Sequence, residues 1–137
     1  MPIVTVHLLE GRYPAGQVSR LLSALTERYA AVLESPPARI RAFAELHPPE
    51  MWLTGGEPGR SAPYFTALVL AGRPVAQRHR LLADFTDLIV DVLGVERASV
   101  RGRIVPVDPD DWGIGGVPAS AARRTEIDAR AAAGSDG

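Results

Sequence analysis

The chain contains two copies of one sequence unit, and this repeat restricts its possible folds more than any other feature. Residues 14–56 align with residues 74–116 without a gap, and residues 2–12 align with residues 63–73. The identical pairs include Leu21 and Leu81, Leu22 and Leu82, Arg41 and Arg101, Trp52 and Trp112, and Gly55 and Gly115. A repeat of this kind predicts two similar structural units in tandem, each of about 60 residues.

Each copy predicts a strand, a helix and a second strand. Residues 2–9 and 63–70 are rich in β-forming residues and are followed by Gly-Arg, which is typical of a strand that ends in a loop. Apolar side chains then recur at helical spacing, from Val18 to Leu33 and from Leu81 to Leu93. Residues 39–46 and 99–105 are expected to be second strands. Segments of these lengths favour a right-handed β-α-β unit with parallel strands.

The fold expected from this pattern is α/β (α+β), with tandem β-α-β units that form a four-stranded sheet with two helices on one face. One unit alone would bury too little surface to be stable. The expected divisions within a single domain of residues 1–137 are a first unit at 2–56, a linker at 57–62, a second unit at 63–124 and a disordered tail at 125–137. The Gly-Gly pairs that follow Trp52 and Trp112 predict short hairpins, and the uncovered sheet face predicts assembly with other chains.

Composition excludes several classes of function. Fifteen basic and sixteen acidic residues give a net charge of -1, so binding to nucleic acid or to an anionic membrane is not expected. The chain has no cysteine, which excludes disulfides and thiolate nucleophiles. No secretory signal is recognisable, and we expect a cytoplasmic protein. His7, His47 and His79 are scattered without ligand spacing, so no metal site is expected.

Four motifs together resemble the tautomerase superfamily. A proline follows the initiator methionine, the first strand closes on Leu-Leu-Glu-Gly-Arg at residues 8–12, an arginine stands early in each second strand, and the second copy ends in Trp-Gly-Ile-Gly-Gly at residues 112–116. The nearest resemblance is to 4-oxalocrotonate tautomerase (2-hydroxymuconate tautomerase), whose subunit is one short β-α-β unit. The chain resembles a fused, tandem version of that subunit over residues 2–124.

The resemblance implies that the secondary amine of Pro2, freed by removal of Met1, acts as the general base. The ordinary pKa of an α-amine is about 7.7 to 8.0, and an apolar pocket among cations lowers it towards neutrality, where a base is most effective. Pro63 occupies the matching position in the second copy, but its nitrogen belongs to a peptide bond and is not basic. We therefore expect one working proline site per chain.

The remaining site residues are implied by position in the family. Arg12 and Arg73 match the family arginine that binds a substrate carboxylate. In the family, this arginine and the catalytic proline come from different units of a dimer. The resemblance therefore implies that Arg73, and by the same logic Trp112, lies at the site of Pro2. Arg41 and Arg101 match a second arginine, supplied by a neighbouring dimer, and the choice between them stays open. The other residues implied at the site are Trp52, in place of a family phenylalanine, and Arg123, which matches a C-terminal arginine.

The implied activity is cofactor-independent enol–keto isomerisation of a small 2-hydroxy or 2-oxo carboxylate or dicarboxylate by a homotrimer of pseudo-dimers. Alternatives are a decarboxylase or hydratase of the same superfamily, or a non-enzymatic carboxylate-binding protein with a decayed site. The related dehalogenases have a different pattern at the positions of Leu9 or Leu70 and of the hairpin residues 53–54 and 113–114. Water addition, the chemistry of those dehalogenases, is therefore the weaker expectation.

Overall fold

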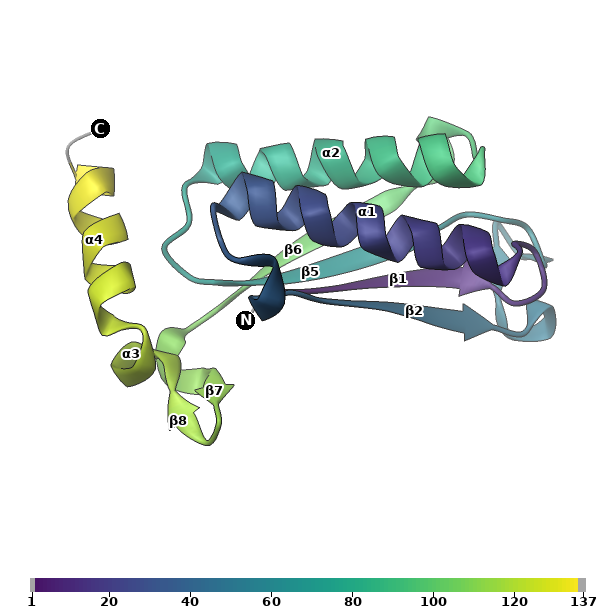
Figure 1. The fold of residues 1–137 in the computed structure, drawn as a ribbon. Coiled ribbons are helices and arrows are strands. Elements are labelled where there is room, and N and C mark those ends of the chain that lie inside the picture. The colour runs from purple at the N-terminus through teal and green to yellow at the C-terminus, as the bar shows by residue number, and fades with distance from the viewer. Residues whose placement is uncertain (1, 136–137) are drawn as a thin grey trace.

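The computed structural model describes residues 2–135 and consists of one four-stranded sheet covered on one face by two helices (Figure 1). The first unit comprises β1 (Ile3–Leu9), α1 (Ala15–Leu33) and β2 (Arg41–His47), and the second comprises β5 (Tyr64–Leu70), α2 (Val75–Leu93) and β6 (Arg101–Val107). The strand order is β2-β1-β5-β6. Strands are parallel within each unit and antiparallel where β1 meets β5. This architecture confirms the predicted fold.

The antiparallel pairing of β1 with β5 brings opposite ends of the two units together. The beginning of β1, after Pro2, lies beside the end of β5, while the beginning of β5, after Pro63, lies beside the end of β1. The loops that follow each first strand therefore reach the proline of the other unit. We refer to the two ends of the sheet as the Pro2 end and the Pro63 end.

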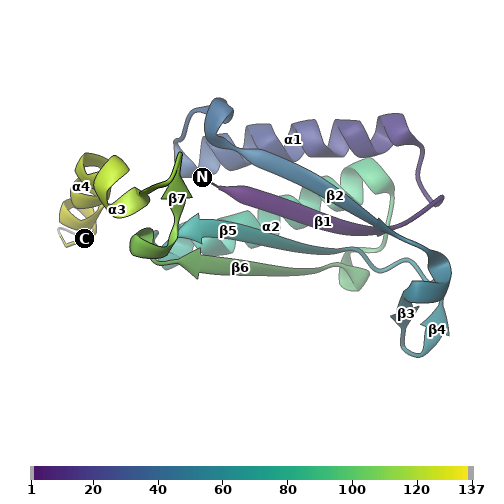
Figure 2. The ribbon, with the colours of Figure 1, turned by 90° about the horizontal axis from the view of Figure 1, so that it is seen from below.

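Each unit finishes in a short hairpin. The first pairs β3 (Leu53–Thr54) with β4 (Glu57–Pro58), and the second pairs β7 (Gly113–Ile114) with β8 (Val117–Pro118). The two hairpins lie at opposite ends of the sheet (Figure 2). The two glycines at each turn have positive φ, which suits the tight turns of such hairpins. The strand β4 takes up the first two residues of the segment expected to be a linker.

The core lies between the sheet and the two helices. Alternate strand residues such as Val4, Val6, Phe65 and Ala67 point towards the helices and are fully buried. The helices contribute Leu21, Leu25, Tyr29, Leu81, Phe85 and Ile89 to the same cluster. The rings of Tyr29 and Phe85, one from each helix, meet edge to face with centroids 5.0 Å apart. Because the two units share this one core, neither has a core of its own.

The repeat is not symmetric where Phe65 packs. In the first unit Val4 lies opposite Ala42, whereas in the second unit the larger Phe65 lies opposite Gly102. A Cβ atom on Gly102 would lie 2.0 Å from Cζ of the Phe65 ring, so no side chain fits there. In the second unit, the larger side chain of Phe65 on β5 is therefore accommodated by the missing side chain of Gly102 on β6.

The C-terminal segment differs from the expectation of a disordered tail. The short helix α3 (Ala119–Ala122) is followed by α4 (Arg124–Ser135), which lies at the Pro2 end of the sheet (Figure 1). Alanine has the highest intrinsic helix propensity, and ion pairs from Arg124 to Asp128 and from Arg130 to Glu126 join successive turns. Residues 136–137 of the expected tail lie outside the described residues. Among residues 2–135, no helix is long and apolar enough to cross a membrane.

Candidate functional site

Pro2 lies buried at the beginning of β1, where the parallel strand β2 also begins. The backbone N–H of Arg41 donates to the Pro2 carbonyl oxygen over 3.1 Å. At the other end of the sheet, the N–H of Arg101 donates in the same way to Pro63 over 3.0 Å. The repeat therefore places an arginine backbone beside each proline, although only Pro2 stands near the chain terminus.

A small pocket at the Pro2 end collects side chains from both units and from α4. It is lined by Pro2, Leu33, Ser35, Arg39, Leu70, Arg73, Arg123, Glu126 and Arg130. The enclosed volume is about 20 Å³, which is enough for about one water molecule. Four guanidinium groups and one carboxylate share this pocket, so it carries a surplus of positive charge.

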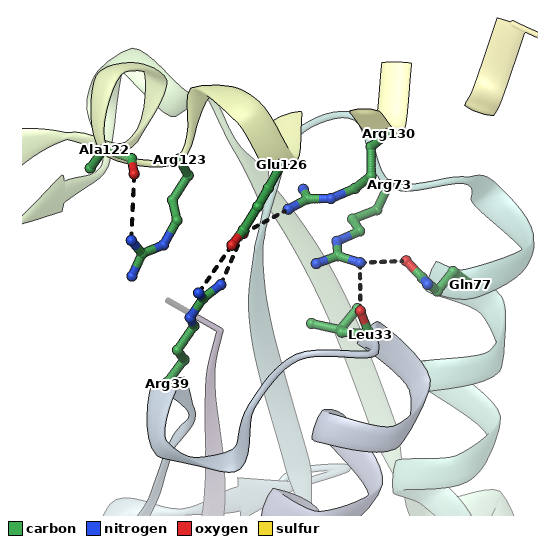
Figure 3. Close-up of polar contacts among 8 residues, drawn as sticks. All are labelled: Leu33, Arg39, Arg73, Gln77, Ala122, Arg123, Glu126 and Arg130. Carbon is green, nitrogen blue, oxygen red and sulfur yellow. Dashed lines mark hydrogen bonds and ion pairs between the residues drawn. The ribbon is translucent and has the colours of Figure 1, made fainter. Parts of the chain in front are cut away.

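Arg73 reaches the Pro2 pocket from the loop between β5 and α2. Its Nη1 donates to the carbonyl oxygen of Leu33 over 2.9 Å and to Oε1 of Gln77 over 3.4 Å (Figure 3). Burial, and then repulsion by Arg130, lower the pKa of Arg73 to about 10. The side chain stays protonated at neutral pH. Since β1 and β5 are antiparallel, the structure brings Arg73 rather than Arg12 to the Pro2 pocket.

Glu126 of α4 lies among the arginines of this pocket (Figure 3). Its carboxylate accepts hydrogen bonds from both terminal nitrogens of Arg39, at 2.9 and 3.0 Å, and Arg130 lies 3.8 Å away. These hydrogen bonds lower the pKa of Glu126 and raise that of Arg39. Burial lowers the pKa of Arg130. The Glu126 carboxylate thus neutralises part of the positive charge in this pocket.

Arg123 has a buried nitrogen without a hydrogen-bond partner. Within residues 2–135, its Nε is shielded from solvent and makes no hydrogen bond. A buried donor without a partner costs about 1–3 kcal/mol. An anionic oxygen bound in this pocket would supply the missing acceptor.

Arg41 and Trp112 form a second group at the Pro2 end. Together with Ile3 and residues 113–115 they line an open pocket of about 300 Å³. Arg41 lies on the sheet face that the helices leave uncovered, directly beside the first residues of β1. Two of the predicted site residues are therefore close to Pro2 within one chain.

The remaining predicted residues lie at the Pro63 end. Arg12 is exposed and borders an open pocket of about 440 Å³, which Leu93, Val95 and Ser99 also line. In the repeat alignment these three residues correspond to Leu33, Ser35 and Arg39 of the Pro2 pocket. Arg101 borders a different surface, beside Thr54 and Ala98, and Trp52 lies beside His47. The two ends of the sheet are thus related by the repeat but differ in charge and in enclosure.

Sequence reasoning missed three residues of the Pro2 pocket, namely Arg39, Glu126 and Arg130. Arg39 was expected inside a strand, but the 3₁₀ turn Pro37–Arg39 precedes β2 and directs this side chain to the pocket. Glu126 and Arg130 belong to the segment expected to be disordered. Their spacing of four residues, typical of a helical ion pair, was the available signal.

The expectation that the histidines are scattered is wrong for His7 and His47. Nδ1 of His7 lies 2.8 Å from Nε2 of His47 because β1 and β2 pair side by side. His79 is exposed on α2. The pair lies towards the Pro63 end, away from the pocket of Pro2.

Comparison with known proteins gives consistent results over nearly the whole chain. A family model described as tautomerase enzyme matches twice, at residues 2–60 and 63–122. A protein of Ralstonia nicotianae, named a probable tautomerase, is 35% identical over 69 residues, which cover 50% of this chain and 99% of that protein. Among solved structures, native fused 4-OT has a TM-score of 0.84 at 25% identity, covering 89% of this chain and 99% of that chain. A fused 4-OT that forms an asymmetric trimer has a TM-score of 0.83 at 27% identity, with 88% and 98% covered.

Proposed function

The chain belongs to the tautomerase family, and we propose that it is a cofactor-independent enol–keto tautomerase that uses the amine of Pro2 as its general base. Its substrate is a small 2-hydroxy or 2-oxo carboxylate or dicarboxylate. The observation that carries this proposal is the pocket in which Pro2 stands among Arg39, Arg73, Arg123 and Arg130.

The base becomes available when Met1 is removed, because the nitrogen of Pro2 then changes from an amide to a secondary amine. Proline is small enough for the initiator methionine to be removed before it. In a buried position among cations, the ammonium form is disfavoured and the neutral amine is available near pH 7. A base with a pKa close to the working pH transfers protons most efficiently.

The proposed reaction moves one proton. The Pro2 nitrogen takes the proton from the enol hydroxyl, the oxygen–carbon bond becomes a carbonyl, and the double bond shifts so that carbon accepts the proton from the ammonium. The carboxylate of the substrate binds Arg73 and the donors around it, since a guanidinium offers two parallel hydrogen bonds to a planar carboxylate. Positive charge near the enolate oxygen stabilises the charge that develops there.

Only the Pro2 end is proposed to be catalytic. Pro63 follows Ala62 in mid-chain, so its nitrogen stays an amide. The pocket at the Pro63 end, which Pro63 itself does not line, has Ser99 in place of Arg39, and Arg12 there is exposed where Arg73 is half-buried. The first difference removes a positive charge, and the second leaves the remaining charge screened by solvent.

We also propose that the chain works as a homotrimer of pseudo-dimers. The support is that the similar fused 4-OT forms a trimer and that Phe43, on the uncovered sheet face, is 49% exposed. In such an assembly Arg41 or Arg101 of a neighbouring chain could complete the site. A cytoplasmic location stays a prediction.

The decisive experiment compares two matched variants. Intact mass first establishes whether Met1 is removed, and a retained methionine would exclude the proline base. We then expect Pro2→Ala to lower kcat for ketonisation of 2-hydroxymuconate and related small enols by at least about a hundredfold, the usual contribution of a general base. Pro63→Ala should leave kcat nearly unchanged. Equal losses in the two variants would show that proline acts structurally at both ends.

A further inference from the structure

Three potential metal ligands meet on the uncovered face of the sheet, near the ends of β1 and β2. Nδ1 of His7 lies 2.8 Å from Nε2 of His47 and 3.3 Å from Oε2 of Glu45. These three ligand atoms all lie within 4.8 Å of one another. The parallel register sets Glu45 opposite His7, and His47 two residues further along β2 on the same face.

The fold does not require polar residues at these positions. In the second unit the aligned residues are Leu68, Val105 and Val107, all aliphatic. Val105 and Val107 lie on β6 as Glu45 and His47 lie on β2, and Leu68 lies on β5 as His7 lies on β1. Two imidazoles and a carboxylate therefore replace an apolar trio at one end of an otherwise repeated structure.

Hydrogen bonding alone satisfies this cluster incompletely. Nδ1 of neutral His7 either carries a hydrogen and donates, or lacks one and accepts from His47, so it cannot accept from His47 and donate to Glu45 at the same time. A cation would accept electron pairs from all three atoms at once. Around a tetrahedral ion with bonds of about 2.0–2.1 Å, ligand atoms lie about 3.3 Å apart, so the imidazoles need to separate by only about 0.5 Å.

Neighbouring rings hold both imidazoles in place. The ring of Tyr64 stacks on His7 at 5.6 Å, and Trp52 meets His47 edge to face at 5.2 Å. Both rings also line an open pocket of about 270 Å³ that borders the two histidines. Fixed ligand orientation favours metal binding, and the pocket leaves a coordination position for water or a small ligand.

We propose that His7, Glu45 and His47 form a binding site for one divalent transition-metal ion, with two imidazole nitrogens and one carboxylate oxygen as ligands. This ligand set suits Zn²⁺ and its neighbours Ni²⁺ and Co²⁺ better than Mg²⁺ or Ca²⁺, which prefer oxygen ligands alone. The fourth position stays open, as it does in zinc sites of the His₂Glu type.

The site is separate from the proposed proline chemistry. His7 stands five residues after Pro2 along β1, a separation of about 16 Å at the usual rise of a strand. All three ligands come from one chain, so the assembled protein should bind one ion per chain. The proposal does not depend on tautomerase activity.

The test measures zinc binding to the full-length assembled protein after treatment with a chelator. We expect about one Zn²⁺ per chain by elemental analysis and titration calorimetry. We also expect about a tenfold or greater loss of affinity in His7→Ala, His47→Ala and Glu45→Gln. His79→Ala is the matched control, because it removes the third histidine from α2, and it should bind as the unaltered protein does.

Co²⁺ provides a spectroscopic readout that does not depend on affinity alone. Bound at this site it should give the intense visible absorption of a four-coordinate ion, and that absorption should disappear in His7→Ala. If a histidine variant loses its assembly, Glu45→Gln, which alters a side chain 58% exposed, carries the comparison. Absence of stoichiometric zinc, or equal binding by the His7 and His79 variants, would overturn the proposal.

Discussion

Glu126 and Arg39 are joined by two parallel hydrogen bonds, of 2.9 and 3.0 Å, beside the buried Pro2. The family match ends at residue 122, so the helix that carries Glu126 is an addition to the repeated fold. The Glu126 carboxylate lines the Pro2 pocket and pairs with Arg39, so under the proposed function it would compete with a substrate carboxylate for Arg39.

Removing the charge of Glu126 should favour substrate binding. We expect Glu126→Gln to lower KM for small carboxylates by about two- to fivefold, the strength of a partly exposed ion pair, with kcat little changed. Asp128→Asn is the control, since Asp128 lies on the exposed side of the same helix and pairs with Arg124. A higher KM in Glu126→Gln would show instead that Glu126 holds Arg39 in a binding position.

The same ion pair should make the attachment of α4 depend on pH. The pKa of Glu126 is lowered in the folded protein, so its contribution to stability is complete above the ordinary glutamate pKa of about 4.3. It is lost as the pH falls through the lowered value. The difference in unfolding free energy between the unaltered protein and Glu126→Gln, measured by urea titration, should be constant at neutral pH and vanish in acid. A difference that persists in strong acid would contradict this origin.

Arg73 and Arg12 occupy matching positions and should behave differently. Arg73→Ala should raise KM for carboxylates by about ten- to a hundredfold through the loss of charge-assisted hydrogen bonds. Arg12→Ala should change KM by less than about twofold, as expected of an exposed side chain. Steady-state kinetics give both values, and unfolding midpoints check that loss of the Arg73 contact with Leu33 has not unfolded the protein. A larger effect of Arg12→Ala would reverse the assignment across the two units.

The contact between Phe65 and Gly102 should be specific to the second unit. Gly102→Ala should destabilise the protein by about 1–3 kcal/mol, because the added methyl group overlaps the ring. In the double variant Phe65→Val with Gly102→Ala, which copies the pair Val4 and Ala42, the cost of the alanine should largely disappear. Urea unfolding of the four proteins gives the coupling energy, and strictly additive effects would show that the ring and the glycine do not constrain each other.

The repeated elements could be predicted from the sequence because they depend on local patterns. Helical spacing of Leu21, Leu25 and Tyr29, and the Gly-Gly turns after the two tryptophans, are readable without tertiary structure. The covered and uncovered faces of the sheet follow from alternation along each strand. The segment after residue 124 was misread, because its composition resembles a disordered tail while its helix is held by contacts with Arg39 in another part of the chain.

The site could be predicted only in part for the same reason. Pro2, Arg73 and Arg123 were identified from a family resemblance, and they lie together in one pocket. Arg39 was missed because a turn, rather than the predicted strand, sets its direction. The pairing of His7 with His47 was missed because forty positions separate them in sequence, whereas adjacent strands bring them into contact.

The sequence by itself determined the tandem units, their strands and helices, and the internal position of Pro63, whose nitrogen is an amide. Those properties depend on residue order and on covalent structure. Only the tertiary structure decided which arginines surround Pro2, that Glu126 lies among them, and that two histidines and a glutamate meet at the other end of the sheet. The physical reason is that the antiparallel pairing of β1 with β5 and the docking of α4 are set by burial across the whole molecule, which no local pattern specifies.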